Sequence, residues 1–172
     1  MAATTAKPAT RPGAIARTRG EGEAIWFLDN LLTVKADARD GAAFACIEAA
    51  LPAGSRTPFH SHQDEDEAWY VLEGEITFFV EGADGRIRVI RASAGSYVHA
   101  PRGIAHGFRT ETAVRLLVIT GVEGFVEMVR EAGGPAARRE LPPLAPPDMA
   151  RLGAAAAHRH IDILGPLPES LA

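Results

Sequence analysis

The chain has 172 residues, which is enough for one domain with a buried core. Its apolar fraction of 47% and charged fraction of 23% are typical of a soluble globular protein. The net charge of −4 gives no electrostatic reason to expect a nucleic acid or an anionic membrane as a partner. No apolar run approaches the roughly 18 residues of a membrane-spanning helix.

The N-terminal segment, residues 1–20, is basic and contains no acidic residue. It lacks the apolar stretch of a secretory signal, and Pro8 and Pro12 interrupt any amphipathic helix of a transit peptide. We therefore expect a disordered tail. The single cysteine, Cys46, excludes an internal disulfide and favours a reducing compartment, so we expect a cytoplasmic protein.

Residues 21–121 carry the pattern of a β-domain. Short apolar or alternating runs are separated by turns rich in Gly, Pro, Asp and Asn, and no helical periodicity lies among them. The expected strands lie within residues 24–36 (with a turn at Asp29 and Asn30), 43–51, 67–74, 75–81, 86–92, 96–100, 105–111 and 113–121. This series predicts an all-β sandwich or barrel.

Residues 122–172 differ in kind. Residues 124–133 have apolar positions near helical spacing and end at two glycines, and a proline-rich link follows. An Ala-rich segment then begins at Asp148, a residue type that caps helix N-termini. We expect a short helical appendage that covers part of the barrel or a partner, with a docked or loose terminus from residue 161 onward.

Residues 54–74 hold the most informative side chains. His60 and His62 are two positions apart, so in a strand they project from the same face. A hairpin after them brings Glu67 alongside, and His106 lies beyond a Pro-x-Gly turn. Imidazoles and a carboxylate that converge on one point are the ligands of a divalent transition metal. The acidic residues between them, 64–66, are expected to form a solvated loop whose negative field favours cations.

Two motifs make the resemblance to a family specific. The first reads G-x5-H-x-H-x4-E-x6-G, and the second reads G-x5-P-x-G-x2-H. They lie on Gly54, His60, His62, Glu67 and Gly74, and then on Gly95, Pro101, Gly103 and His106. In order and spacing they resemble the two motifs of the cupin superfamily. One position departs, because Thr110 stands where the second motif usually ends in Asn.

This resemblance implies a cupin jelly-roll barrel with one metal held by His60, His62, Glu67 and His106. Iron, manganese, nickel, cobalt, copper and zinc all accept imidazole with carboxylate, so the ion stays open. The two motifs with a helical appendage are similar to single-domain, quercetin 2,3-dioxygenase-like cupins. In that family a flavonol binds the metal through its 3-hydroxyl, and dioxygen adds to the heterocycle with loss of carbon monoxide. The resemblance makes Glu67 both a metal ligand and the catalytic base.

The period of two extends the site to its pocket. If Glu67 points inward then so does Trp69, and if His106 points inward then so do Phe108 and Thr110. These side chains are candidates for a pocket that holds a flat aromatic substrate, and packing of the barrel interior is their alternative role.

A second functional class remains open at this stage. A non-oxidative cupin, either a sugar isomerase or a small-ligand-binding protein, fits the same motifs, because one fold carries many functions. The expected partners are an aromatic small molecule and dioxygen, with no nucleic acid and no membrane. We also expect a homodimer, for which Trp26 and Phe27 offer an apolar surface.

Overall fold

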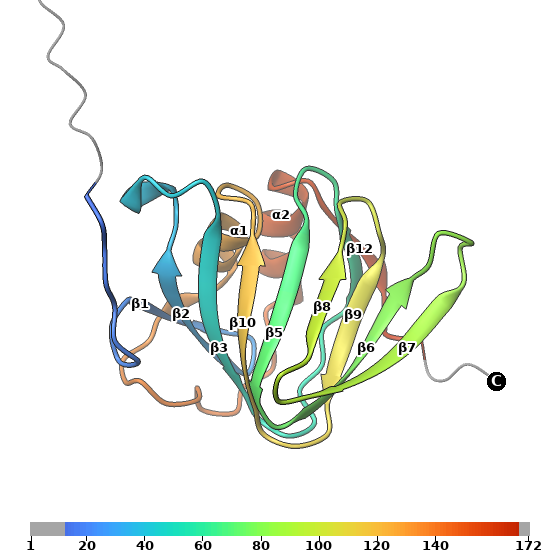
Figure 1. The fold of residues 1–172 in the computed structure, drawn as a ribbon, viewed down its shortest axis with the longest axis horizontal. Helices are drawn as coiled ribbons and strands as arrows, with labels where there is room; N and C mark the ends of the chain where they lie inside the picture. Colours follow the sequence, from blue (N-terminus) through green and yellow to red (C-terminus); the bar gives the residue numbers. More distant parts are fainter. Residues whose placement is uncertain (1–12, 169–172) are drawn as a thin grey trace, which may run out of the picture.

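The computed structural model describes residues 13–168, so the expected tail, residues 1–20, falls mostly outside the described residues. Within them the chain forms two antiparallel sheets that face each other, with two short helices after the strands (Figure 1). The expected cupin-type jelly roll with a C-terminal helical appendage is confirmed. None of the helices in this part of the chain is long and apolar enough to cross a membrane.

The larger sheet has the strand order β11-β1-β2-β3-β10-β5-β8. Its strands are β1 (Glu23–Phe27), β2 (Asn30–Ala36), β3 (Ala45–Leu51), β5 (Glu67–Glu73), β8 (Tyr97–Ala100), β10 (Val114–Thr120) and β11 (Gly134–Pro135). A short 3-10 turn, Ala38–Asp40, joins β2 to β3. Alternation sets the faces, because in β3 every second residue from Ala45 to Leu51 is buried.

The smaller sheet has the strand order β12-β4-β9-β6-β7. Its strands are β4 (Phe59–His62), β6 (Glu75–Glu81), β7 (Ile87–Ser93), β9 (His106–Thr110) and β12 (Ile161–Gly165). β5 passes directly into β6 at Gly74, whose φ of 87° favours glycine. A Cβ at Gly74 would also lie 2.2 Å from the Ala113 carbonyl oxygen. This crossing from one sheet to the other therefore depends on glycine.

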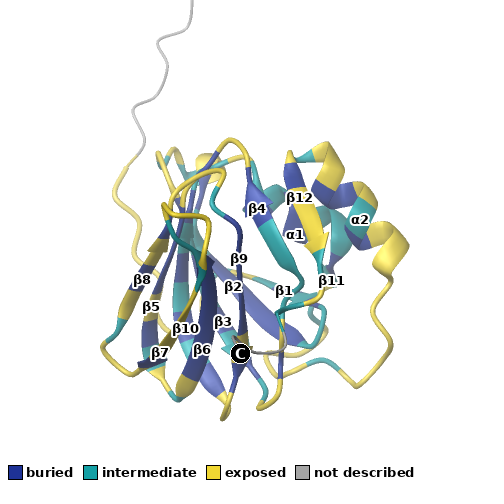
Figure 2. Ribbon diagram, turned by 90° about the vertical axis from the view of Figure 1, so that its right-hand side faces the viewer, coloured by how far each residue is buried: buried dark blue, intermediate teal, exposed yellow. Residues whose placement is uncertain are grey.

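Helices α1 (Phe125–Ala132) and α2 (Met149–His158) lie on the side of the barrel formed by β1, β4 and β12, opposite β7 and β8 (Figure 2). Asp148 caps α2, as expected, by accepting a hydrogen bond from the Arg151 N–H. The buried faces of both helices join the same apolar core as the strands, through Val126, Val129 and Leu152.

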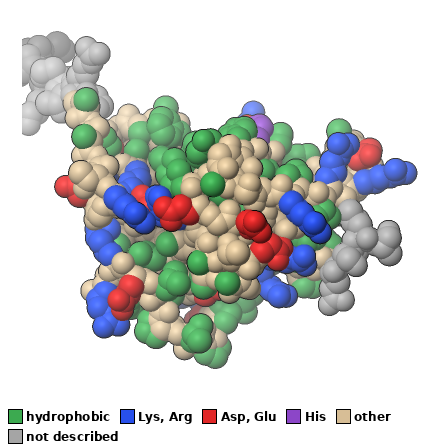
Figure 3. Space-filling view, turned by 60° about the horizontal axis from the view of Figure 1, so that its bottom comes forward, with side chains coloured by type: hydrophobic (Ala, Val, Ile, Leu, Met, Phe, Trp, Pro, Cys, Tyr) green, Lys and Arg blue, Asp and Glu red, His purple; other side chains and the backbone are tan. Residues whose placement is uncertain are grey.

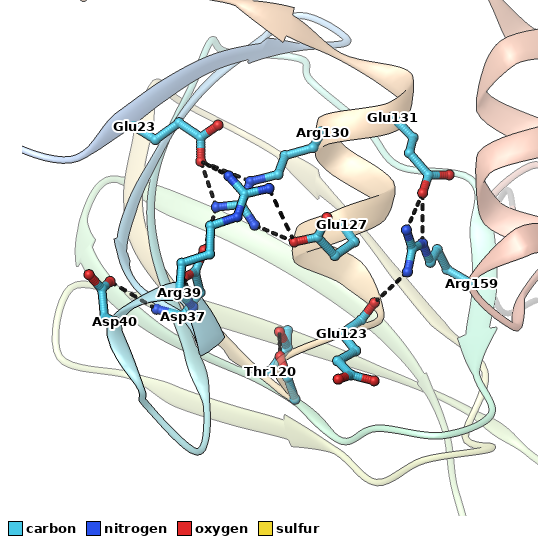
Figure 4. A network of polar contacts seen from close by, with 11 residues as sticks. Glu23, Asp37, Arg39, Asp40, Thr120, Glu123, Glu127, Arg130, Glu131 and Arg159 are labelled. Carbon is cyan, nitrogen blue, oxygen red and sulfur yellow. Dashed lines mark hydrogen bonds and ion pairs between the residues drawn. The ribbon is translucent and has the colours of Figure 1, made fainter. Parts of the chain in front are cut away.

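A half-buried arginine ties α1 to the barrel (Figure 4). Arg130 reaches Glu23 of β1 at 2.8 Å and also pairs with Asp37 and with Glu127. Burial opposes the charge on Arg130, but hydrogen bonds to these carboxylates raise its pKa further above the ordinary value. Beside it, Arg159 donates to Glu131 at 2.8 Å and joins α1 to the end of α2 (Figure 4).

Two short strands were not expected. β12 lies in the segment expected as a docked or loose terminus, and it pairs with β4, with Ile161 opposite His62 and Ile163 opposite His60. β11 covers the outer edge of β1. The appendage thus extends both sheets as well as contributing helices.

The apolar surface expected at Trp26 and Phe27 is largely covered. Phe27 is buried, with its ring edge against Phe125 at a centroid distance of 6.3 Å. The Trp26 indole N–H donates to the Glu140 carbonyl at 2.8 Å. The homodimer stays a prediction, and this strand no longer supports it.

On the face seen in Figure 3, acidic and basic side chains are interspersed.

Candidate metal centre

The four expected ligands come from both sheets. His60 and His62 lie on β4 and His106 lies on β9 of the smaller sheet, whereas Glu67 begins β5 of the larger sheet. One potential ligand atom from each of the four lies within 4.8 Å of the others. Their convergence between the sheets follows from sheet register, because His60 stands directly opposite His106.

The cluster is shielded from solvent. His62 and His106 are each 1% exposed and Glu67 is 3% exposed, while His60 is half-buried. Burying a carboxylate is unfavourable unless it is paired. Oxygen Oε2 of Glu67 lies 3.1 Å from Nε2 of His62 and 3.1 Å from Nε2 of His106. Glu67, His62 and His106 therefore form one electrostatic unit.

Backbone carbonyls orient two of the imidazoles. Nδ1 of His60 lies 2.8 Å from the Pro58 carbonyl oxygen, and Nδ1 of His106 lies 2.8 Å from the Ile104 carbonyl oxygen. With Nδ1–H donating to a carbonyl, each ring turns Nε2 toward the cluster, where Nε2 of His106 contacts Oε2 of Glu67. In a metal-bound site this nitrogen would carry the lone pair that binds the ion.

The third imidazole has a side-chain partner instead. Nδ1 of His62 lies 3.0 Å from Oε1 of Glu65, which is itself only 8% exposed. The interpretation of residues 64–66 as a solvated loop is therefore wrong for Glu65. It holds for its neighbours, since exposed Asp64 pairs with His160 and exposed Asp66 pairs with His99. Sequence reasoning missed Glu65 because its flanking residues are also acidic; its position three residues after His62 was the available signal.

The donor set fits a divalent transition metal. Nε2 of His62 is buried, and although Oε2 of Glu67 lies 3.1 Å away, it makes no well-aligned hydrogen bond within the described residues, so an ion would satisfy it. Three imidazole nitrogens and one carboxylate suit manganese, iron, cobalt, nickel, copper or zinc. Four ligands in an octahedral arrangement leave two positions for other molecules. His60, His62, Glu67 and His106 could thus hold an ion that remains open to small molecules.

Without an ion, a protonated His62 offsets the negative charge of Glu67 inside the site. Burial lowers the pKa of His60 to about 3, which keeps that ring neutral. Burial also acts to lower the pKa of His62, but Glu67 and Glu65 outweigh it and raise the pKa to about 9. Burial would raise the pKa of Glu67, yet the neighbouring His62 and His106 hold it far below the ordinary value. The carboxylate is therefore ionised at neutral pH.

An apolar cavity of about 60 Å³ lies beside the cluster, and both His60 and Glu67 line it. Its other walls come from the barrel interior and from the appendage, which contributes Phe125, Met128 and Leu152. Because helix residues form part of the wall, the appendage encloses the space next to the candidate metal position.

The structure places Trp69 and Phe108 in the lining of this cavity. Trp69 is 1% exposed, its ring lies 5.1 Å from that of His106, and its indole N–H has no hydrogen-bond partner among the described residues. Thr110 is also buried but lies outside the lining, since its hydroxyl donates to the Pro52 carbonyl at 2.6 Å. Both residues therefore point inward from β9, but Phe108 lines the cavity whereas Thr110 contacts the loop at Pro52.

A larger groove of about 710 Å³ adjoins the cavity on the outer side. The residues that line both spaces are Leu28, Thr57, Pro58, Leu152 and Ile163. Leu28 has a φ of 56°, in the left-handed region that an ordinary side chain rarely adopts. It occupies the tight turn between β1 and β2, so an unfavourable backbone conformation coincides with the wall between cavity and groove.

Comparison with known proteins assigns the fold family. The profile of the cupin domain matches residues 47–120, a segment that includes all four candidate ligands. The chain carries a cupin domain. A quercetin 2,3-dioxygenase from Bacillus subtilis (strain 168) is 28% identical over 118 residues, which cover 67% of this chain and 34% of that protein. The chain thus matches about a third of the length of this relative.

One solved structure supports the fold: a variant of Bacillus subtilis oxalate decarboxylase aligns with a TM-score of 0.54 and 17% identity, covering 67% of this chain and 32% of that one. A putative ethanolamine utilization protein from Salmonella typhimurium aligns with a TM-score of 0.45 and 28% identity, covering 54% of this chain and 69% of that one.

Proposed function

We propose that the protein is a metal-dependent dioxygenase of the quercetin 2,3-dioxygenase-like cupin type, acting on a flavonol or a similar aromatic hydroxy-ketone. The observation that carries this proposal is the apolar cavity lined by His60 and Glu67, two of the four candidate ligands. The relation to a quercetin 2,3-dioxygenase over 67% of the chain supports the same reaction class.

Glu67 is the proposed base. A redox-active ion held by the four ligands would supply the oxygen chemistry and bind the hydroxyl oxygen of the substrate. Glu67 is ionised and lies at the cavity wall, where a carboxylate oxygen can accept the proton of that hydroxyl. Loss of this proton makes the aromatic ring electron-rich. One dioxygen is then consumed for each carbon monoxide released.

The cavity walls favour an aromatic substrate. Trp69 and Phe108 offer aromatic surfaces, and the unpartnered indole N–H of Trp69 is a donor for a substrate oxygen. The cavity of about 60 Å³ is smaller than the roughly 300 Å³ or more of pockets that hold drug-sized ligands. We therefore place only the reacting ring inside, with the rest of the molecule extending past Leu28 into the outer groove.

The same walls argue against a sugar isomerase. A sugar presents hydroxyl groups on every side, and each one needs a hydrogen-bond partner when it is buried. Away from the ligands, the polar side chains lining the cavity are those of Asn30, Thr57 and Trp69. A binding protein for a small apolar ligand, without turnover, remains the alternative that the experiment below separates from the enzyme.

Dioxygen uptake tests the proposal. The purified protein is stripped of metal, loaded in turn with each candidate ion and offered quercetin in an oxygen-electrode cell. We expect uptake with at least one ion, with carbon monoxide released in equal amount. Glu67→Gln should retain part of the metal and lose turnover, whereas the exposed control Glu75→Gln should behave as the parent protein. Full turnover in Glu67→Gln would contradict the role of Glu67 as the base. No dioxygen uptake with any ion would contradict the proposed dioxygenase activity.

A further inference from the structure

Glu65 is a buried acid in an otherwise exposed loop. It is 8% exposed, while Asp64 and Asp66 on either side face solvent. A carboxylate is buried only where donors compensate for the lost water. Oxygen Oε1 of Glu65 lies 3.0 Å from Nδ1 of His62 and also accepts a hydrogen bond from the backbone N–H of Phe125. One oxygen thus joins a candidate metal ligand to the C-terminal appendage.

The connection between β10 and α1 is shaped to receive this carboxylate. A Cβ added at Gly124 would lie 2.2 Å from Oε1 of Glu65, and one added at Gly121 would lie 2.7 Å from Oε2. Contacts under about 3.0 Å essentially never occur at real Cβ atoms, so with Glu65 in this position both sites have room only for glycine. The absence of side chains at Gly121 and Gly124 therefore leaves the space that the Glu65 carboxylate occupies.

The Glu65 carboxylate also caps the N-terminus of helix α1. Phe125 is the first residue of α1, and Gly124 at the N-cap provides no side chain to accept its N–H. Glu65, 60 positions earlier in the chain, provides that acceptor. A negative charge at a helix N-terminus is favourable because it faces unpaired N–H groups and the positive end of the helix dipole. Helix α1 and the loop carrying Glu65 therefore stabilise each other.

The same Glu65 oxygen also orients the imidazole of His62. A hydrogen bond from Nδ1–H to a carboxylate fixes the tautomer and the ring orientation, and it makes Nε2 a better metal ligand. His60 and His106 obtain the same orientation from backbone carbonyls two residues earlier in the chain, just before β4 and β9. Among the three imidazoles, His62 is the one whose orientation depends on a side chain and, through it, on the start of α1.

We propose that Glu65 is a positioning residue that couples docking of the C-terminal helix α1 to metal affinity at His62. This inference rests on the proposed metal site and assigns a role to the appendage within it. When α1 is docked, Phe125 and the two glycines hold Glu65, and Glu65 holds His62 with Nε2 toward the ion. Coupling of this kind is reciprocal, so a bound metal must also favour the docked helix.

Metal affinity in four variants tests the coupling. Co(II) affinity is measured by competition with a chromogenic chelator, and its visible absorption reports ligand geometry. Glu65→Ala should bind about 10- to 100-fold more weakly, the usual effect of removing such a partner, with a changed Co(II) spectrum. Glu65→Gln keeps an acceptor oxygen and should lose less. Gly124→Ala displaces Glu65 without touching a ligand and should resemble Glu65→Ala.

Gly153→Ala is the matched control, because a Cβ at this position in α2 meets nothing within 4 Å. It should bind Co(II) as the parent does. Hydrogen exchange gives the reverse readout, since metal should slow exchange of the Phe125 amide in the parent and much less in Glu65→Ala. Circular dichroism establishes that each variant is folded where affinity is measured; if Glu65→Ala does not fold, Gly124→Ala and Glu65→Gln carry the test.

The outcomes are distinguishable. A parent protein that binds none of the candidate ions removes the proposed metal site itself. A parent that binds Co(II) tightly, with Glu65→Ala or Gly124→Ala binding equally tightly and giving the same spectrum, removes the coupling and leaves the proposed function intact. The coupling is supported if both variants bind Co(II) more weakly and give an altered spectrum, while Gly153→Ala keeps the affinity and the spectrum of the parent.

Discussion

His60 lies directly opposite His106 in the antiparallel pair of β4 and β9, and their ring centroids are 4.5 Å apart. Each ring is oriented by a backbone carbonyl two residues earlier, in the segment that leads into its strand. The two ligands are therefore placed by backbone geometry alone. Glu67 faces them from the other sheet, so the candidate ion would lie between the layers of the barrel.

Removal of one of these ligands should abolish tight metal binding. We expect His106→Ala to lose more than the about 100-fold in affinity that marks the upper range for outer-shell changes, because it removes a direct ligand. The control is His99→Ala, since His99 is exposed and pairs with Asp66 outside the cluster. Equal metal content in the two variants, measured by elemental analysis, would contradict the ligand assignment.

Trp69→Phe should weaken substrate binding without altering the metal. The change keeps an aromatic wall but removes the unpartnered N–H of the cavity. A hydrogen bond contributes about 1 kcal/mol, so we expect a KM about fivefold higher and an unchanged Co(II) affinity. Trp26→Phe serves as the control because its N–H donates to Glu140, outside the cavity lining. The donor role fails if KM stays the same in Trp69→Phe.

Leu28→Trp should obstruct the passage between groove and cavity. Leu28 lines both spaces, so a larger side chain there fills the path proposed for the substrate. We expect kcat/KM for a flavonol to fall about tenfold or more, since a misplaced reacting group loses rate steeply, while metal content is kept. Leu144→Trp, at a position that is 96% exposed, is the matched control. Steady-state kinetics with unchanged kcat/KM in Leu28→Trp would place the passage elsewhere.

Arg130→Met should destabilise the fold through the polar network of Figure 4. The change leaves the buried carboxylate of Asp37 without its arginine partner. We expect the free energy of unfolding to fall by about 2 to 3 kcal/mol, measured by urea denaturation. Arg138→Met removes an exposed pair with Glu140 and should change it by less than about 1 kcal/mol. Similar losses in both variants would show that burial of the network is unimportant.

The contact between α1 and α2 should weaken in acid. The hydrogen bond from Arg159 holds the pKa of Glu131 below its ordinary value of 4.5. A carboxylate with a lowered folded-state pKa contributes stability above the unfolded-state pKa and loses it as the pH falls. The difference in unfolding free energy between the parent and Glu131→Gln should therefore be present at pH 6 and shrink below about pH 4. A difference that grows in acid would reverse the assigned sign.

The barrel and the four clustered residues could be predicted from the sequence because their signals are local. Alternation and turn residues are encoded within each strand, and the two motifs fix the spacing of His60, His62, Glu67 and His106. Glu65 was missed because its burial depends on Phe125, which lies 60 positions away. The role of Leu28 was missed likewise, since its φ is not readable from leucine at that position. β12 was missed because it exists as a strand only by pairing with β4.

The most direct test of the central claim is a crystal structure of the protein loaded with Co(II), with anomalous scattering recorded at the cobalt edge. We predict one strong peak per chain between the two sheets, about 2.0 to 2.2 Å from Nε2 of each of the three histidines and from an oxygen of Glu67. A peak elsewhere, or a fully loaded crystal in which any of the four side chains turns away from the ion, would contradict the account.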